Sequence, residues 1–257
     1  MNILEARVVL RDRTMLDVVD LALRFLVRHG WAYAKVALVA VVPPFLFTWW
    51  VSSSAGWGWS WVFAMLLAPF AAAPFTSLAS RLLFEEKVSS REAVRAALGS
   101  VFRLIGVRIT ELFALLAGLS MFVLPAAWFL GLFAFANEVV VLERAPVGAS
   151  LGRLQRLLFG QSGEVITAAL FLTALHILAV FMGDLVGRAI LEELLQISAP
   201  PSMLDAHGSV LGLASFFAFV PFGATCRFLV YINVRTRTEG WDVQTRFAAI
   251  AARELAS

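Results

Sequence analysis

Six polar side chains fall inside or close to long apolar stretches of this 257-residue chain. They are Arg108, Glu111, Asn137, Glu138, His176 and Arg227, here called the intramembrane polar cluster. Ionisable groups are costly inside a membrane, so they are candidates for function once a structural partner has been considered. Arg108 precedes Glu111 by three residues, which places both on one helical face and allows an ion pair. We expect these groups to meet in one buried cluster, which either packs the helices or forms a path for an ion or a lipid headgroup.

The histidine of this cluster has two open interpretations. His176 falls near the middle of an apolar stretch, three residues after Thr173. The imidazole either relays protons through the membrane or, as a neutral ring, hydrogen-bonds to a neighbouring helix. Further along the same stretch, Asp184 and Arg188 are four residues apart, and we expect them to form an ion pair.

The sequence contains few candidate catalytic residues. Its three histidines fall on different sides of the predicted membrane, and the usual nucleotide-binding and metalloprotease motifs are absent. The lone cysteine, Cys226, has no second thiol with which to form a disulfide or share a metal. Four side chains of the longest outer segment match no metal-binding motif: Glu192, Glu193, Asp205 and His207. We therefore predict no catalytic residue, no metal site and no cofactor.

Six apolar stretches must position these side chains. Each is about long enough, as a helix, to cross a hydrocarbon core about 30 Å thick. They cover residues 31–50, 59–83, 105–124, 126–142, 165–187 and 211–232. The hydrophobic fraction of 60% and the charged fraction of 15% lie outside the range of ordinary soluble domains. We predict an all-α polytopic membrane protein with about six transmembrane helices; whether residues 126–142 cross fully or re-enter stays open.

The basic residues gather at one end of these stretches. Of the 21 Lys and Arg residues, all but Arg188 fall in the four segments that an even number of crossings leaves on one side. Because positive charge stays cytoplasmic, we predict that both termini are cytoplasmic. Anionic headgroups account for the net charge of +3, so we expect membrane lipids, and no nucleic acid, as partners. Nineteen arginines against two lysines suggest a GC-rich bacterial genome, and hence the bacterial inner membrane.

An amphipathic helix followed by two apolar stretches occurs three times along the chain. Thr14 and Asp17 make a capping box before the first such helix; Ser89 and Glu92 repeat it before the second, whose polar side we extend to Arg103. The third lacks the box. Two interpretations stay open: a threefold repeat, or the alternation of apolar and basic segments found in any multi-span protein. The chain is expected to form one integral membrane domain over residues 1–257, with an interfacial helix over 1–30, a six-span bundle over 31–232 and a cytoplasmic amphipathic tail over 233–257.

The most distinctive string, YINVRTRTEGWD, follows the sixth stretch. Its motif residues are Tyr231, Asn233, Arg235, Arg237, Glu239, Gly240 and Asp242. As a helix, the string stacks Tyr231, Arg235 and Glu239 at four-residue intervals. We therefore expect an ion pair between Arg235 and Glu239.

This string resembles the Y-I-D-x-R-x-R-x-E-G-x-D signature of bacterial multi-span proteins related to the membrane domain of glycerophosphodiester phosphodiesterases. The segments TMLDVVDLALRFLVRHGWAYAKV and ANEVVVLERAPVGASLGRLQRLLFG are similar to the same group, so the resemblance covers nearly the whole layout. Two departures are Asn233, where the group usually has Asp, and Gly152-Arg153, where Arg-Ser is expected. The phosphodiesterase domain itself is absent, so the resemblance implies a membrane module without hydrolase activity.

These observations lead to one expected function and two alternatives. We expect a non-enzymatic inner-membrane module or accessory subunit with a cytoplasmic collar of basic amphipathic helices. The collar would bind lipid headgroups and dock a protein partner or a second copy of the chain. The alternatives are a small transporter or lipid-translocating protein that uses the intramembrane polar cluster, and the membrane subunit of a split enzyme.

Overall fold

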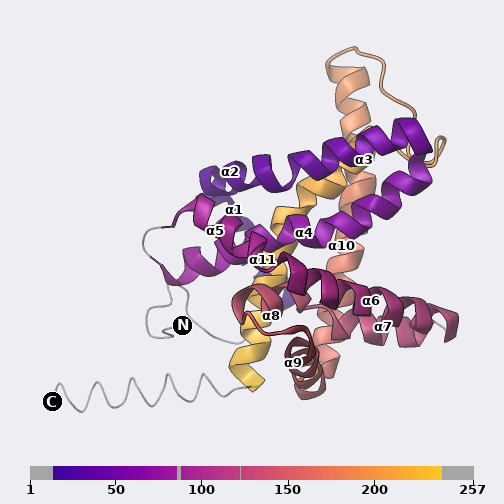
Figure 1. The fold of residues 1–257 in the computed structure, drawn as a ribbon. Coiled ribbons are helices and arrows are strands. Elements are labelled where there is room, and N and C mark those ends of the chain that lie inside the picture. The colour runs from indigo at the N-terminus through magenta and orange to yellow at the C-terminus, as the bar shows by residue number, and fades with distance from the viewer. Residues whose placement is uncertain (1–13, 86–87, 122, 239–257) are drawn as a thin grey trace.

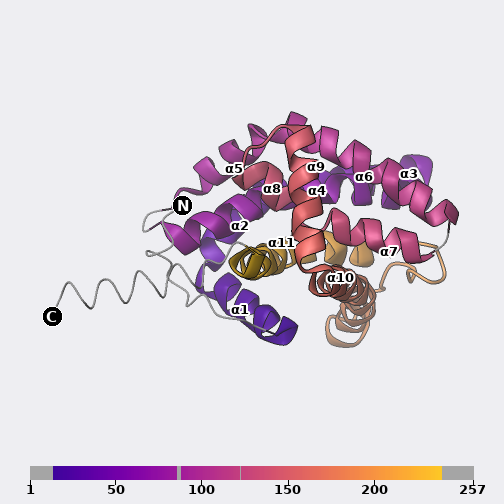
Figure 2. The same ribbon diagram turned by 90° about the horizontal axis from the view of Figure 1, so that it is seen from below.

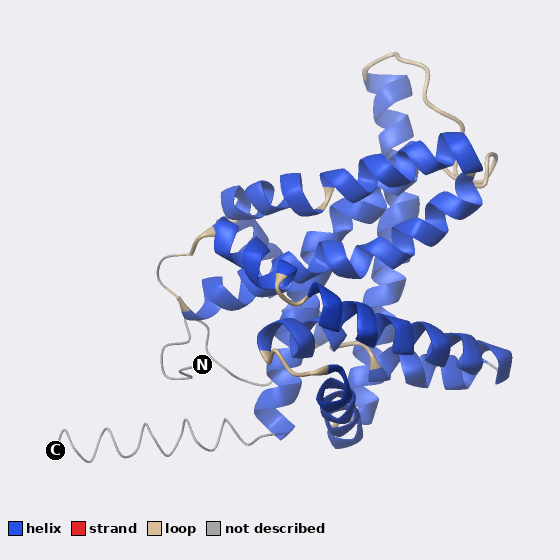
Figure 3. Cartoon of the chain, in the orientation of Figure 1, coloured by secondary structure: helices blue, strands red, loops and turns tan. Residues whose placement is uncertain are grey.

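The computed structural model describes residues 14–85, 88–121 and 123–238. The regular structure among these residues is helical, and none of them forms a strand (Figures 1 and 3). In chain order the elements are α1 Met15–Arg28, α2 Gly30–Ala40, α3 Val42–Ala55, α4 Trp57–Phe84, α5 Ser90–Leu98, α6 Val101–Met121, α7 Val123–Leu132, α8 Ala136–Leu142, α9 Val147–Gly160, α10 Ser162–Ala189, the π-helix η2 Ile190–Leu194 and α11 Val210–Thr238. The described part of the chain is therefore all-α, as the sequence predicts.

Five segments of the described chain are long and apolar enough to cross a membrane. They are Trp57–Leu83, Val101–Met121, Leu124–Leu142, Ser162–Leu194 and Val210–Thr238. A sixth crossing results if α2 and α3, which are bent by 42° at Val41, form one broken span. Pro43 and Pro44 at the start of α3 explain the bend, because proline lacks the N–H that would continue the bonding of α2. The prediction of a multi-pass helical membrane protein is confirmed.

The fourth apolar stretch consists of α7 and α8, with a break at residues 133–135 between them. Its two ends have different surroundings. Leu124 is 83% exposed, whereas α8 is buried from Ala136 to Val141. Because α4 and α6 pack against α8, this short helix carries its polar residues into the interior of the bundle.

Helix α1 begins with the capping box that the sequence predicts, and it packs on the bundle. Thr14 and Asp17 exchange hydrogen bonds and complete the capping box. The opposite side of the helix buries Val18 and Ala22, and α1 packs on α11. The amphipathic pattern of this segment therefore faces the bundle with its apolar side.

Helix α5 departs from the prediction in two respects. Ser89 is the N-cap residue, but its side chain makes no capping hydrogen bond, so the predicted capping box is wrong. The Glu92 carboxylate, which would complete the box, instead accepts a hydrogen bond of 2.7 Å from Arg81 on α4. In addition, α5 ends at Leu98, so Arg103 belongs to the spanning helix α6 and not to the amphipathic helix.

Helix α11 runs through the centre of the bundle. It packs against α1, α3, α4, α9 and α10, and Figure 2 shows it among its neighbours. A hydrogen bond of 2.8 Å joins its buried Thr225 to Tyr33 of α2. Small residues let α10 approach closely, because a Cβ added at Gly183 would lie only 1.7 Å from Ser215 Oγ. Side chains of α11 are therefore placed where several helices can reach them.

Candidate functional site

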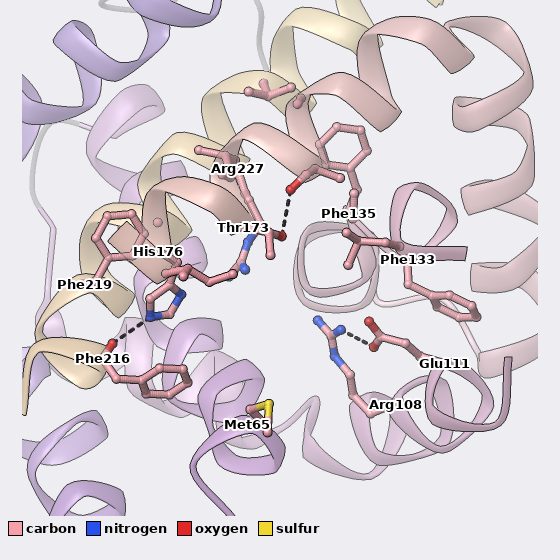
Figure 4. A pocket seen from close by; sticks show the side chains of 18 of the residues that line it. Met65, Arg108, Glu111, Phe133, Phe135, Thr173, His176, Phe216, Phe219 and Arg227 are labelled. Atoms are coloured by element: carbon pink, nitrogen blue, oxygen red, sulfur yellow. Dashed lines mark hydrogen bonds and ion pairs between the residues drawn. The ribbon is translucent and has the colours of Figure 1, made fainter. Parts of the chain in front are cut away.

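A cavity of about 350 Å³ lies where α4, α6, α7, α10 and α11 meet (Figure 4). Apolar side chains form most of its wall, among them Leu130, Leu172, Ile177, Phe216 and Phe219. Its polar lining residues are Arg108, Glu111, Thr173, His176 and Arg227. A mainly apolar cavity of this size with a few polar groups is typical of a small-molecule site. Four members of the predicted cluster thus line one cavity, and the other two, Asn137 and Glu138, contact lining residues.

Arg108 is held from two sides. Its Nη1 pairs with the Glu111 carboxylate on the same helix, as predicted, and its Nη2 donates to Asn137 Oδ1 at 2.6 Å. The Asn137 amide in turn donates to the Pro69 carbonyl of α4 at 2.7 Å. Only 16% of the Arg108 side chain and 14% of the Glu111 side chain are exposed. This connected set of polar contacts joins α4, α6 and α8 at one wall of the cavity.

Arg227 on α11 is held far less tightly. Its Nε lies 4.0 Å from Glu138 Oε1, which is too long for a hydrogen bond. Glu138 is fully buried; its Oε1 accepts a hydrogen bond of 3.3 Å from Thr76, and its Oε2 has no partner in the described chain. The Arg227 guanidinium forms no hydrogen bond with any described residue. Figure 4 shows it pointing into the same space as the guanidinium of Arg108, so its donors are available to a ligand.

His176 forms the contact expected of a histidine bonded to a neighbouring helix. Its Nε2 lies 3.0 Å from the Phe216 carbonyl oxygen on α11, so Nε2 carries the proton and donates it. The ring contacts those of Phe216 and Phe219, with centroids 4.5 and 4.6 Å away. Thr173 donates to the Ala169 carbonyl of its own helix at 2.8 Å. The imidazole therefore joins α10 to α11, and its Nδ1 is an acceptor in this tautomer.

The cavity opens on the apolar outer surface of the bundle. Met65 of α4 and Ile177 of α10 both line it, and they are 59% and 54% exposed. Exposed apolar side chains on membrane-spanning helices face lipid hydrocarbon. Lining residues of the cavity therefore also lie on the surface that faces lipid.

The C-terminal motif forms a second polar site, around Glu143 at the end of α8. Tyr231 Oη donates to Glu143 Oε1 at 2.6 Å; Arg235 Nη1 donates to Tyr231 Oη at 3.0 Å and lies 3.6 Å from the same carboxylate oxygen. Arg153 of α9 donates to this oxygen at 3.2 Å. Glu143 is not among the predicted site residues. The signal for it is a lone carboxylate where an apolar stretch ends and a basic segment begins.

Two further motif residues bind one carboxylate on α10. Asn233 Nδ2 donates to Glu164 Oε1 at 2.8 Å, and Arg237 Nη1 donates to Oε2 at 2.7 Å. An aspartate at position 233, as in the resembled signature, would place a second carboxylate against Glu164, so asparagine fits this partner better. Glu164 is also missing from the predicted set. Three motif residues, and with them the predicted partner of Arg235, lie outside the described residues: Glu239, Gly240 and Asp242.

The predicted ion pair between Asp184 and Arg188 is wrong. Arg188 pairs with Glu192 at 3.4 Å and also donates to the Pro200 carbonyl. The Asp184 carboxylate accepts a hydrogen bond of 3.1 Å from the Met203 backbone N–H, because the connection before α11 folds back onto the end of α10. In the described residues, no group of three or more His, Cys, Asp or Glu side chains is placed to hold a metal ion.

The relation of this chain to other proteins gives no further guide to the site. Comparisons with protein-family models, with curated proteins and with solved structures found no match. The resemblance to the membrane domain of glycerophosphodiester phosphodiesterases therefore stays a prediction.

Proposed function

We propose that this chain is a non-enzymatic membrane protein that binds an anionic amphiphile in the cavity between its spans. The observation that carries the proposal is the Arg227 guanidinium, which faces a largely apolar cavity and forms no hydrogen bond within the described chain. Unpaired donors inside a membrane are costly, and a carboxylate or phosphate group satisfies them through a bidentate fork. The anionic group would lie between Arg227 and Arg108.

The charges around the cavity leave room for such a ligand. Arg108 is paired closely with Glu111, whereas Glu138 approaches Arg227 only to 4.0 Å. An anionic group that hydrogen-bonds to Arg227 would exchange this distant contact for a direct one. Arg227 is therefore the main contact, and Arg108 forms the opposite edge of the site.

The apolar lining favours an amphiphile over a bare ion. Leu130, Leu172 and Ile177 offer a wall along which an acyl chain can lie. Lipid hydrocarbon and leucine side chains are about equally apolar, so the chain enters from the bilayer at little cost in free energy. The contact between the anionic group and Arg227 then determines which molecules are retained.

The lateral opening at Met65 and Ile177 favours a second candidate function, the translocation of a lipid. A lipid-translocating protein or small transporter would move the headgroup past Arg227 and Arg108 towards the opposite face. Movement of a labelled lipid between the leaflets of a reconstituted vesicle separates this function from binding alone. Binding without movement supports the first function.

The proposed setting follows from the sequence: the bacterial inner membrane, with both termini cytoplasmic. Helices α1, α5 and α9 each precede a pair of spans, an order that supports an interfacial position for them and a threefold repeat. Membrane lipids are the proposed partners, and the basic collar would dock a protein partner or a second copy. The resemblance to a membrane domain without its hydrolase agrees with a non-enzymatic role.

The test is to identify what the full-length protein retains in nanodiscs or a mild detergent by native mass spectrometry and lipid analysis. We expect one anionic amphiphile per chain. The double variant Glu138→Gln/Arg227→Gln, which leaves no unpaired charge, should retain about tenfold less, as expected for the loss of a charged hydrogen bond. The matched control is Arg156→Gln, at an exposed arginine of α9 outside the cavity, and should bind as the wild type does. Equal retention by the double variant, or no anionic amphiphile on the wild type, would contradict the proposal.

A further inference from the structure

A second hollow, of about 440 Å³, lies where the ends of several helices meet. It shares no lining residue with the cavity. Four arginines line it, from the end of α4, from α5, from the first turn of α6 and from the connection between α8 and α9: Arg81, Arg95, Arg103 and Arg144. Among its described lining side chains, Glu92 is the only carboxylate. We call this hollow the arginine pocket; its lining has a large excess of positive charge.

Two of the four arginines hold the walls of the arginine pocket together. Arg81 on α4 donates to the Glu92 carboxylate on α5 at 2.7 Å. Arg103 on α6 donates to the Arg144 carbonyl in the connection between α8 and α9. One hydrogen bond therefore joins α4 to α5, and the other joins α6 to the connection between α8 and α9.

The other two arginines are available for binding. Arg95 and Arg144 are exposed, and within the described chain neither side chain forms a hydrogen bond or an ion pair. Both line the same hollow, although they come from segments about fifty residues apart in the sequence. Two guanidinium groups without a carboxylate partner in the described chain thus line the same hollow.

The backbone conformation of Arg144 is unusual for an arginine. Its φ is +53°, in the left-handed region that glycine and asparagine adopt with less strain. The hydrogen bond from Arg103 to the Arg144 carbonyl holds this conformation. Arg144 directly follows Glu143, the C-cap residue of α8, where a left-handed residue commonly ends a helix. This end of α8 places the arginine in the lining of the hollow.

We propose that the arginine pocket binds a phosphate group, with Arg95 and Arg144 as the main contacts. Guanidinium groups bind phosphate oxygens through bidentate forks, and two of them complement the two negative charges of a phosphomonoester. Two sources supply this chemistry: the headgroup of a membrane lipid and a phosphate free in solution. The site goes beyond the proposed function, because it is separate from the cavity and its ligand needs no acyl chain.

The experiment uses the full-length protein in nanodiscs of zwitterionic lipid at low ionic strength. In one arm, inorganic phosphate is titrated and the midpoint of thermal unfolding is followed. In the other, a small fraction of phosphatidic acid is added to the nanodiscs, and native mass spectra count the molecules retained per chain. Saturable stabilisation by inorganic phosphate identifies a free phosphate as the source; retention of phosphatidic acid alone identifies a lipid headgroup. A wild-type protein that responds to neither probe overturns the proposal.

Two variants show whether the response belongs to the arginine pocket. Arg95→Gln combined with Arg144→Asn should weaken binding of the responding probe by about tenfold or more, because two charged contacts are lost. Asparagine relieves the backbone strain at position 144, so this variant should fold at least as well as the wild type. Arg91→Gln, at an exposed arginine of α5 that does not line the pocket, is the matched control. An equal loss in the control would mean that surface charge in general attracts phosphate, which also overturns the proposal.

The outcome is independent of the amphiphile proposed for the cavity. The Arg95 and Arg144 variant should retain that amphiphile unchanged, and the Glu138 and Arg227 variant should bind phosphate unchanged. Failure of one site can thus be recognised while the other still binds.

Discussion

The cavity and the arginine pocket differ in whether their arginines have carboxylate partners. In the cavity even Arg227, the more loosely held arginine, has the Glu138 carboxylate 4.0 Å away. In the arginine pocket, Arg95 and Arg144 have no carboxylate partner within the described chain. The surroundings explain the difference, because Glu138 is fully buried while both pocket arginines are exposed. A charge without a partner costs roughly 3 kcal/mol or more inside a membrane and much less where water or headgroups reach it.

Because of this difference, a substitution in the cavity should change both stability and binding, whereas one in the arginine pocket should change mainly binding. A change to one member of the cavity pair leaves a buried charge behind, so it affects both the fold and the ligand. A change to an unpaired pocket arginine removes a contact for the ligand and leaves no new buried charge. Substitutions at the two sites should therefore differ in how they change the free energy of unfolding and the binding of ligand.

The largest effect is expected for Glu138→Gln, which leaves Arg227 without a carboxylate partner inside the membrane. We expect a loss of about 3 kcal/mol, at the lower end of the range for broken buried pairs, because 32% of the Arg227 side chain is exposed. The midpoint of thermal unfolding in detergent measures it, and adding Arg227→Gln should recover much of the loss. Glu92→Gln, at the exposed carboxylate of the arginine pocket, should cost about 1 kcal/mol or less. Equal losses in the two single variants would remove the distinction between the sites.

A second large effect is expected for Gly183→Ala, at the contact between α10 and α11. The new Cβ would lie 1.7 Å from Ser215 Oγ and 2.3 Å from Ser215 Cβ, so the two helices must move apart. We expect a loss of about 1–3 kcal/mol, and recovery when Ser215→Gly is added. Because α10 and α11 form a wall of the cavity, amphiphile retention should fall while phosphate binding at the arginine pocket stays unchanged. A similar loss at both sites would show that they are not independent.

A smaller effect is expected for Asn233→Asp, which adds a charge where the Glu164 carboxylate already has its partners. Repulsion between two carboxylates should lower stability at neutral pH by about 1 kcal/mol. The midpoint of thermal unfolding at neutral pH measures this loss, and Glu164→Gln in the same chain should remove the effect. A loss that persists with Glu164→Gln would point to packing instead of charge.

The smallest effect, and the only gain, is expected for Arg144→Asn. Asparagine adopts a φ of +53° with less strain than arginine, so stability should rise by about 1 kcal/mol or less. Arg95→Gln, in the regular helix α5, should change stability by less than about 0.5 kcal/mol. Both variants should bind phosphate more weakly, so stability and binding move in opposite directions only at Arg144. Lower stability of Arg144→Asn would show that the arginine side chain supports the fold.

The positions of the spans could be predicted because a span requires only a long apolar run. The predicted stretches 59–83 and 211–232 lie within α4 and α11. The break between α7 and α8 could not be predicted in the same way. Residues 133–135 contain neither proline nor glycine, yet they separate α7 from α8, with Phe133 and Phe135 buried against neighbouring helices. Tertiary packing, which no local pattern contains, determines such breaks.

The candidate site was predictable where its contacts are local. The pairing of Arg108 with Glu111 follows from their spacing on one helix. The sequence pattern does not reveal Glu143 and Glu164, because their partners on α11 are 88 and 69 residues away in the chain. Spacing alone predicts the wrong partner for Asp184, because its carboxylate binds the Met203 backbone N–H in the connection before α11.

The central position of α11 has a consequence for the order in which the protein is made. Glu138 on α8 and Glu164 on α10 are synthesised before the arginines and the asparagine of α11 that contact them. Before α11 has been translated, the earlier helices therefore enter the membrane while Glu138 and Glu164 lack these partners. Only the arrival of the last described helix supplies them. A chain released too early keeps both groups uncompensated, which gives a membrane protease a chemical difference by which to distinguish it from the finished protein.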